Sequence, residues 1–267
     1  MTEARESADP KSTTHARHAP GSPGWVSLMA HETAATQDFY AALFGWEFEP
    51  GPPQLGPYAR ALLDGHEVAG IGQLPPDRHL PVAWTPYFAS ADVDRTAEIV
   101  RHSGGTVGVG PLDAAEAGRL AIASDPSGAV FGIWQGVAHP GTEITGVPGT
   151  PAWNELVTRD TESVVKFYKG VFGYELRPAA SADFDRVTLY VDGRPVAGVH
   201  GVGNALTRDR GPHWLTYFEA AEPDDAVRLV TELGGRVLVA AHDSPYGRVA
   251  TVADPEGAVF SLIHAVT

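Results

Sequence analysis

The chain has 267 residues, no cysteine and a formal net charge of −14. Without cysteine it has no disulfide and no thiolate-bound metal, and the absence of disulfides is compatible with the cytoplasm, where we expect the protein. The negative charge opposes binding to nucleic acid or to an anionic membrane, because both would repel it. No apolar run approaches the ~20 residues that span a bilayer.

Two segments have the composition of chain outside a folded core. Residues 1–22 carry charges of both signs without an apolar run, which predicts a disordered tail and not a signal peptide. Residues 137–151 contain three prolines and three glycines and show little periodicity, which predicts a linker.

Between these segments the sequence repeats itself at a spacing of 128 to 130 residues. The recurring motifs are Trp-x-x-Leu (25–28 and 153–156), Phe-Tyr (39–40 and 167–168), Phe-Gly-aromatic (44–46 and 172–174), Gly-Gly (104–105 and 234–235) and Asp-Pro-x-Gly-Ala-Val-Phe (125–131 and 254–260). A repeat held this evenly predicts two copies of one domain, at residues 24–136 and 152–267.

Each copy is itself predicted to contain two similar halves. The first half has a strand at 25–30, a helix at 34–43 with Thr33 as its N-cap, and strands at 46–49, 58–63 and 67–74. The second half has a strand at 85–90, a helix at 94–102 that ends at a Gly-Gly pair, and strands at 106–109, 119–123 and 129–135. The second copy follows the same order, with helices at 162–171 and 224–233.

Four β-α-β-β-β units therefore follow one another along the chain. Such units predict an α+β fold of curled, mostly antiparallel sheets with helices on the outer face. Two units side by side enclose a cup.

The ordered motifs resemble the vicinal oxygen chelate superfamily, which includes glyoxalase I, the bleomycin resistance proteins and the extradiol dioxygenases. Within it, the chain is most similar to tandem-domain glyoxalase-like proteins of actinobacteria, and the resemblance covers residues 25–266. It implies two tandem glyoxalase-like domains, each of two βαβββ units. It is specific for the fold and weak for function, because one scaffold carries many activities. Aromatic motif residues such as Phe39 and Tyr40 are expected in the core.

Catalytic members of that superfamily hold a divalent metal ion through His, Gln or Glu side chains that converge from three strands of the cup. At the matching positions this chain has Trp25, Thr85 and Gly132 in the first copy, and Trp153, Leu215 and Ser261 in the second. None of these is a histidine or a carboxylate. The resemblance therefore implies cups without a metal ion, and we expect no cofactor.

The side chains predicted to face the cups are mainly aromatic. Residues i and i+2 of a strand share a face, which directs Trp25, Ser27, Tyr87 and Trp134 into the first cup. The same reasoning directs Trp153, Glu155, His213, Tyr217 and Ser261 into the second cup, with His200 on a neighbouring strand. Aromatic walls with a few polar tips suit a planar, largely apolar organic ligand.

Several functions stay open at this point. The preferred hypothesis is a binding protein for a small hydrophobic or planar metabolite, such as an antibiotic-like molecule. The alternative is a metal-independent tailoring or isomerising enzyme whose second cup uses Glu155 as base and His213 or Tyr217 as acid, the first cup being structural. A metal-dependent lyase or dioxygenase would need Glu155, His200 and His213 as ligands. A further hypothesis is that the cups are collapsed, with the tryptophan side chains filling them and leaving no space for a ligand. The sequence is compatible with a homodimer. No function is predicted for His139, which lies in the linker.

Overall fold

The computed structural model describes residues 18–76, 80–178, 185–207 and 210–265. The first unit contains β1 (Pro23–Ala30), α1 (Thr33–Phe44), β2 (Glu47–Pro50), β3 (Tyr58–Leu63) and β4 (His66–Gln73), and the second contains β5 (Ala83–Ala89), α2 (Val93–His102), β6 (Thr106–Asp113), β7 (Gly118–Ser124) and β8 (Val130–Gly136). The third unit contains β9 (Pro151–Thr158), α3 (Glu162–Phe172), β10 (Glu175–Pro178), β11 (Asp185–Val191) and β12 (Arg194–Gly201). The fourth contains β13 (His213–Glu219), α4 (Pro223–Glu232), β14 (Arg236–Ser244), β15 (Gly247–Ala253) and β16 (Val259–Ala265).

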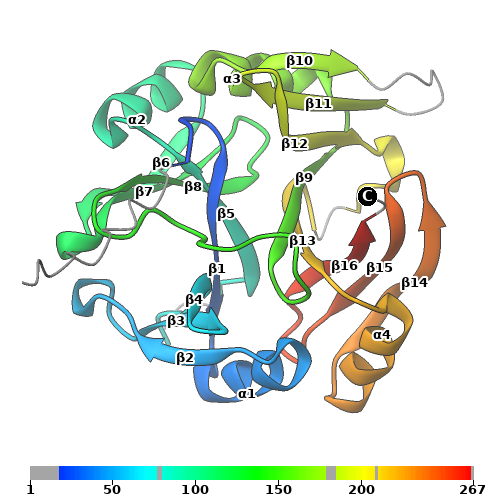
Figure 1. The fold of residues 1–267 in the computed structure, drawn as a ribbon. Coiled ribbons are helices and arrows are strands. Elements are labelled where there is room, and N and C mark those ends of the chain that lie inside the picture. The colour runs from blue at the N-terminus through cyan, green and yellow to red at the C-terminus, as the bar shows by residue number, and fades with distance from the viewer. Residues whose placement is uncertain (1–17, 77–79, 179–184, 208–209, 266–267) are drawn as a thin grey trace, which may run out of the picture.

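These strands form two eight-stranded sheets, one for each copy of the repeat (Figure 1). The first has the order β2-β3-β4-β1-β5-β8-β7-β6, and the second repeats it as β10-β11-β12-β9-β13-β16-β15-β14. In each sheet, two units join through an antiparallel pair, β1 with β5 and β9 with β13. The predicted α+β fold of tandem glyoxalase-like domains is confirmed.

Each of the two large hydrophobic clusters is built mainly from one unit of each copy. In the first–fourth core, Leu28 and Ile71 pack in one cluster with Phe218 and Phe260. In the second–third core, Phe88, Phe131 and other side chains of the second unit pack with Phe167, Tyr168 and Trp214 of the second copy. Figure 1 shows the same pairing for the helices, with α1 beside α4 and α2 beside α3. The two copies therefore complete each other's interiors.

A buried tyrosine links the copies in each core. The Tyr40 hydroxyl donates to Asp254 Oδ2 at 3.1 Å and accepts from Trp84 Nε1 at 2.9 Å. In the other core, the Tyr168 hydroxyl donates to Asp125 Oδ2 at 3.0 Å and accepts from Trp214 Nε1 at 3.0 Å. The repeated Phe-Tyr and Asp-Pro motifs therefore meet across the copies.

The N-terminus of α1 is capped by the second copy, so the prediction of Thr33 as N-cap is wrong. The N-cap residue is Glu32, whose own side chain makes no capping bond. The carboxylate of Glu256 instead accepts hydrogen bonds from the backbone N–H groups of His31 and Glu32, both at 2.8 Å, and from the Thr36 hydroxyl at 3.0 Å. Local sequence reasoning could not find this acceptor because it comes from the other end of the chain.

The segment between β8 and β9, predicted as a linker, lies against the first sheet. The backbone N–H of His139 donates to the carbonyl of Ala117 at 3.2 Å, and that of Thr142 donates to the carbonyl of Gly24 at 2.7 Å. Residues 1–17 of the predicted tail lie outside the described residues, whereas the N–H of Gly21 donates to the carbonyl of Ala89 at 2.8 Å. No helix in the described part of the chain is long and apolar enough to cross a membrane.

Candidate functional site

The concave face of the first sheet lines a cavity of about 720 Å³. Strand alternation places Trp25 of β1 and Tyr87 of β5 on this face, while Val26 and Phe88 point into the cores. Trp134 of β8 lines the same cavity. Further apolar walls come from Met29, Leu55, Leu112, Leu120 and Ile122. The volume lies within the ~300–1,000 Å³ range of small-molecule sites, and the tryptophans leave this space open.

The polar atoms of these aromatic walls bond to one another. Trp25 Nε1 donates to the Tyr58 hydroxyl at 2.9 Å, and the Ser27 hydroxyl donates to the Tyr87 hydroxyl at 3.0 Å. Ser27 is fully buried and does not line the cavity itself. Burial raises the pKa of Tyr58 and of Tyr87, so both phenols stay neutral over the physiological range.

The residues at the superfamily's metal positions do not fit a metal ion. The Tyr87 ring occupies the space over Gly132, where an added Cβ would lie 2.1 Å from the ring. In the second cup the hydroxyl of Ser261 lies 3.0 Å from that of Thr251. Across the described ranges of the chain, no cluster of three or more His, Asp or Glu side chains could hold a metal ion.

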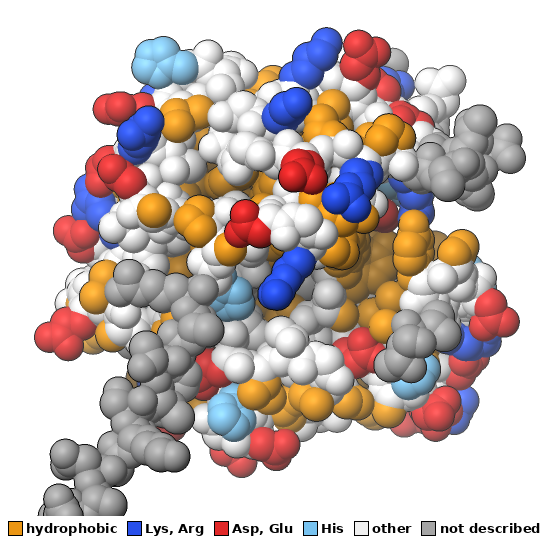
Figure 2. Space-filling model, turned by 45° about the horizontal axis from the view of Figure 1, so that its top comes forward, with side chains coloured by type: hydrophobic (Ala, Val, Ile, Leu, Met, Phe, Trp, Pro, Cys, Tyr) orange, Lys and Arg blue, Asp and Glu red, His pale blue; other side chains and the backbone are white. Residues whose placement is uncertain are grey.

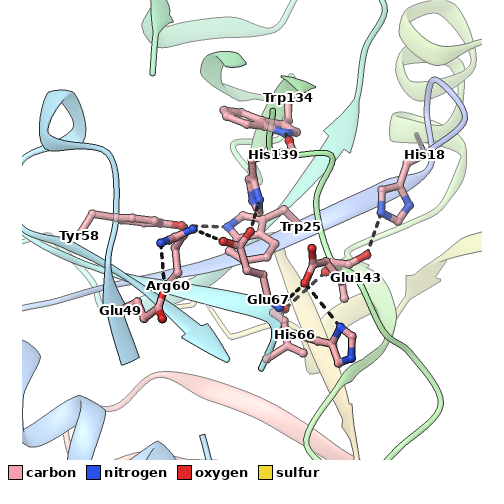
Figure 3. A network of polar contacts seen from close by, with 12 residues as sticks. His18, Trp25, Glu49, Tyr58, Arg60, His66, Glu67, Trp134, His139 and Glu143 are labelled. Atoms are coloured by element: carbon pink, nitrogen blue, oxygen red, sulfur yellow. Dashed lines mark hydrogen bonds and ion pairs between the residues drawn. The ribbon is translucent and has the colours of Figure 1, made fainter. Parts of the chain in front are cut away.

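At the edge of the first cup lies a charged group that the sequence analysis missed (Figure 3). Glu67 of β4 forms an ion pair with Arg60 of β3, and its carboxylate contacts Nδ1 of His139, from the segment between the copies. Arg60 Nη2 also lies 3.1 Å from Glu49 Oε2. Burial by itself would raise the pKa of Glu67, but the contacts with His139 and Arg60 outweigh it and lower that pKa, so the carboxylate is ionised. Both Arg60 and His139 line the cavity.

Little in the sequence points to this group. Arg60 and Glu67 are charged residues inside predicted strands, which is a weak signal of a polar site. His139 stands in a segment without periodicity, so its place over the cup follows only from the backbone hydrogen bonds that bring the segment back to the first sheet.

In the second cup a buried carboxylate, Glu155, gathers three polar side chains. Its Oε2 accepts a hydrogen bond from the Tyr217 hydroxyl at 3.2 Å and lies 3.6 Å from His200 Nδ1, and its Oε1 lies 3.5 Å from Arg186 Nη1. Burial, together with the charge of Glu155, raises the pKa of Tyr217, so the phenol is a hydrogen-bond donor. Arg186 was not predicted. It stands opposite His200 in the register of β11 and β12, which only the pairing of the strands reveals.

His213 does not join this group. Its Nδ1–H donates to the carbonyl of Gly211 at 2.8 Å, and burial lowers its pKa. The structure thus brings Glu155, Tyr217 and His200 together but leaves His213 apart, so the ligand set Glu155, His200 and His213 is not assembled.

The two remaining predicted ligand residues of the second cup differ in exposure. Trp153 is half-buried, and Ser261 is fully buried and stands beside Tyr217 in the register. Figure 2 shows a hollow with largely hydrophobic walls over the second sheet, on the right of the view.

Comparison with known proteins agrees with this fold. Residues 155–263 match the family model described as a glyoxalase-like domain. The chain is 36% identical over 261 residues to the anthracycline biosynthesis protein DauV of Streptomyces sp. (strain C5), a match that covers 92% of this chain and 94% of that protein. The chain belongs to the glyoxalase-like proteins of the vicinal oxygen chelate superfamily. The resemblance seen in the sequence motifs is confirmed.

Solved structures of the superfamily share the fold of this glyoxalase-like protein. The Mn(II)-bound glyoxalase from Novosphingobium aromaticivorans superposes with a TM-score of 0.64 at 16% identity, covering 92% of this chain and 84% of that one. The 2,3-dioxygenase LapB from Pseudomonas sp. KL28 has a TM-score of 0.64 at 13% identity, with 94% of each chain covered. At these identities the likeness concerns the fold alone.

Proposed function

We propose that the protein binds a planar, largely apolar organic metabolite in its first cup, without a metal ion. The observation that carries the proposal is the cavity of about 720 Å³ whose walls combine Trp25, Tyr87 and Trp134 with aliphatic side chains. Its volume falls within the ~300–1,000 Å³ of small-molecule sites. Flat indole and phenol rings offer faces and edges against which a planar ligand can pack.

The ligand class that fits best is a polycyclic aromatic metabolite with oxygen substituents. The relative DauV is named for anthracycline biosynthesis, and anthracyclines have fused, planar rings with phenolic and quinone oxygens. The cavity lining includes Gln54 and Arg60, whose N–H groups can donate to such oxygens. The net charge of −14 supports a small-molecule partner over nucleic acid or an anionic membrane.

A pair of matched substitutions tests the first cup as the binding site. Ile122 lines the cavity and faces Gly132, and Thr251 stands at the same place in the second copy, facing Ser261. We expect Ile122→Trp to fill the first cup and weaken binding of 1,4-dihydroxyanthraquinone at least tenfold (about 1.4 kcal/mol). Thr251→Trp should leave the affinity unchanged. Quenching of tryptophan fluorescence on titration measures both.

Two results would contradict this proposal. One is the absence of saturable binding of the anthraquinone to the unmodified protein. The other is a reversed pattern, in which Thr251→Trp and not Ile122→Trp removes binding, since that would move the ligand to the second cup.

A second function, acid–base chemistry in the second cup, is favoured by the contact between Glu155 and Tyr217. The carboxylate can accept a substrate proton, and the phenol 3.2 Å away can then turn its single O–H from the carboxylate to a developing oxyanion. Arg186, 3.5 Å from the same carboxylate, would stabilise negative charge.

Deuterium exchange at the C–H bond next to the carbonyl of an enolisable ketone measures this chemistry. If the second cup, and not the first, acts on such a ketone, Glu155→Gln should lower protein-catalysed deuterium exchange into 2-tetralone by about 100-fold, the lower end of general acid–base contributions. Proton NMR in D₂O measures the rate. Equal rates for Glu155→Gln and the unmodified protein would remove Glu155 as a base.

A further inference from the structure

We propose that the first cup is also a proton-transfer site, in which His139 is the general base and Glu67 its positioning residue. The substrate class is a planar aromatic ketone with a C–H bond next to the carbonyl. This inference rests on the proposed function, because it needs a first cup that admits a planar organic molecule.

The contact between Glu67 and His139 determines which imidazole nitrogen is available. His139 Nδ1 faces the Glu67 carboxylate, in a close contact that is not aligned as a hydrogen bond. Both side chains are largely buried, with exposed fractions of 16% and 14%. A carboxylate beside Nδ1 favours the tautomer that carries its proton there, which leaves the lone pair on Nε2. His139 lines the cavity, so this lone pair is available to a molecule bound there.

The imidazole is held in place from both halves of the first sheet. The carbonyl of His139 accepts a hydrogen bond from Trp134 Nε1 at 2.9 Å, and its N–H donates to Ala117 at 3.2 Å. Its ring meets the Trp25 ring edge to face, with centroids 4.5 Å apart. Figure 3 shows His139 near Trp134, with Trp25 and Glu67 beside it. A base fixed in this way on the wall of an apolar cavity is preorganised for one direction of attack.

A cation lies in the same cavity wall. Arg60 lines the cavity, and its guanidinium contacts both Glu49 and Glu67. Its Nε is buried and makes no hydrogen bond within the described part of the chain. Although the two carboxylates balance its charge, a guanidinium in the cavity wall can donate a hydrogen bond to the oxygen of the enolate formed when a ketone loses a proton.

The chemical step needs no other reactant. The C–H bond next to the carbonyl breaks, its proton moves to His139 Nε2, and the electron pair moves onto the carbonyl oxygen to give an enolate. Glu67 stays ionised and balances the imidazolium charge. Return of the proton to the same carbon gives exchange with solvent, and return to a conjugated carbon gives an isomer.

Deuterium exchange into 2-tetralone, followed by proton NMR with the full-length protein in D₂O, tests the proposal. We expect His139→Gln to lower the protein-catalysed rate by about 100-fold, the lower end of general base contributions. His264→Gln is the matched control, because His264 also stands beside a carboxylate, Glu219 at 3.7 Å, but is exposed on β16 and lines no part of this cavity. Its rate should equal that of the unmodified protein.

Two further variants separate the loss of the base itself from two other effects. These are a change in how the base is positioned and a general loss of structure. Glu67→Gln should lower kcat for exchange about tenfold and leave KM unchanged, since the residue orients the base without touching the ketone. Ile122→Trp fills the cavity with Glu67 and His139 intact, so it should abolish both binding and exchange. Circular dichroism of each variant reports whether it is folded.

The outcomes distinguish the two proposals. If 2-tetralone binds in the first cup but His139→Gln exchanges as fast as the unmodified protein, the proton-transfer site is overturned and the binding function stands. Exchange that survives Ile122→Trp also overturns it, because the reaction then occurs elsewhere. If the unmodified protein binds neither the ketone nor the anthraquinone, both proposals are wrong.

Discussion

The Tyr40 hydroxyl bridges two buried groups that belong to different copies of the repeat. It accepts a hydrogen bond from Trp84 and donates one to Asp254. Without it, an indole N–H and a carboxylate would remain in the interior with one partner fewer. A buried polar group that loses its partner costs about 1–3 kcal/mol.

We therefore expect Tyr40→Phe to lower the free energy of unfolding by about 1–3 kcal/mol, and Tyr168→Phe to do the same in the other core. Urea denaturation followed by circular dichroism measures both. Tyr246, which is exposed, provides the control, and Tyr246→Phe should change stability by less than ~0.5 kcal/mol. Losses below that limit in both buried variants would show that these hydrogen bonds add nothing to stability.

Residue by residue, strand alternation was enough to direct several side chains correctly. Trp25, Tyr87 and Trp134 line the first cavity because the period of two along a strand assigns each residue to one face. The contact between Glu67 and His139 had no such signal, since His139 lies outside any strand or helix. A periodic pattern predicts on which face of a strand a side chain lies, but not which residues it contacts.

Among the elements, α1 depends on an acceptor supplied by the turn before β16. Glu256 accepts from two backbone N–H groups and one hydroxyl at the start of this helix. We expect Glu256→Ala to lower the free energy of unfolding by about 1–2 kcal/mol, the usual effect of losing an N-terminal cap. Ser127→Ala is the matched control in the first copy, because the Ser127 hydroxyl bonds only within its own turn, to Asp125. A smaller loss is expected there, again by urea denaturation.

The effect of Glu256 should also depend on pH. Burial by itself would raise its pKa, but the hydrogen bonds from His31, Glu32 and Thr36 outweigh it and lower that pKa below its ordinary value of 4.5. A carboxyl with a lower pKa in the folded state stabilises the protein above the unfolded pKa and loses this effect as the pH falls through the folded one. The difference between Glu256→Gln and the unmodified protein should therefore shrink below pH ~4.5. A difference that stays constant or grows there would contradict the assignment.

The helices themselves were predictable to within one or two residues, because glycines and polar residues mark their ends. The helix predicted at 34–43 is observed at Thr33–Phe44, and that at 224–233 at Pro223–Glu232. The cap of α1 was not predictable, since a capping residue from another copy leaves no trace near the helix.

In the whole molecule, the repeat predicted the two sheets but not how they pack. Two copies of one motif suggest two interiors, one for each copy. The structure instead packs most of the first unit against the fourth and most of the second against the third. The hydrophobic pattern of β1, for example, predicts that Leu28 is buried. It does not identify Phe218 and Phe260 as the residues with which Leu28 shares a core.

This pairing sets an order for folding during synthesis, because a chain leaves the ribosome from its N-terminus. The second and third units are neighbours in the chain, so they are synthesised one after the other. Most of the hydrophobic core that they share can therefore form before the fourth unit is made. The first unit emerges before all others and completes its interior with side chains as late as Leu262. We therefore expect Leu28 and Ile71 to lack these native partners until the fourth unit has been synthesised.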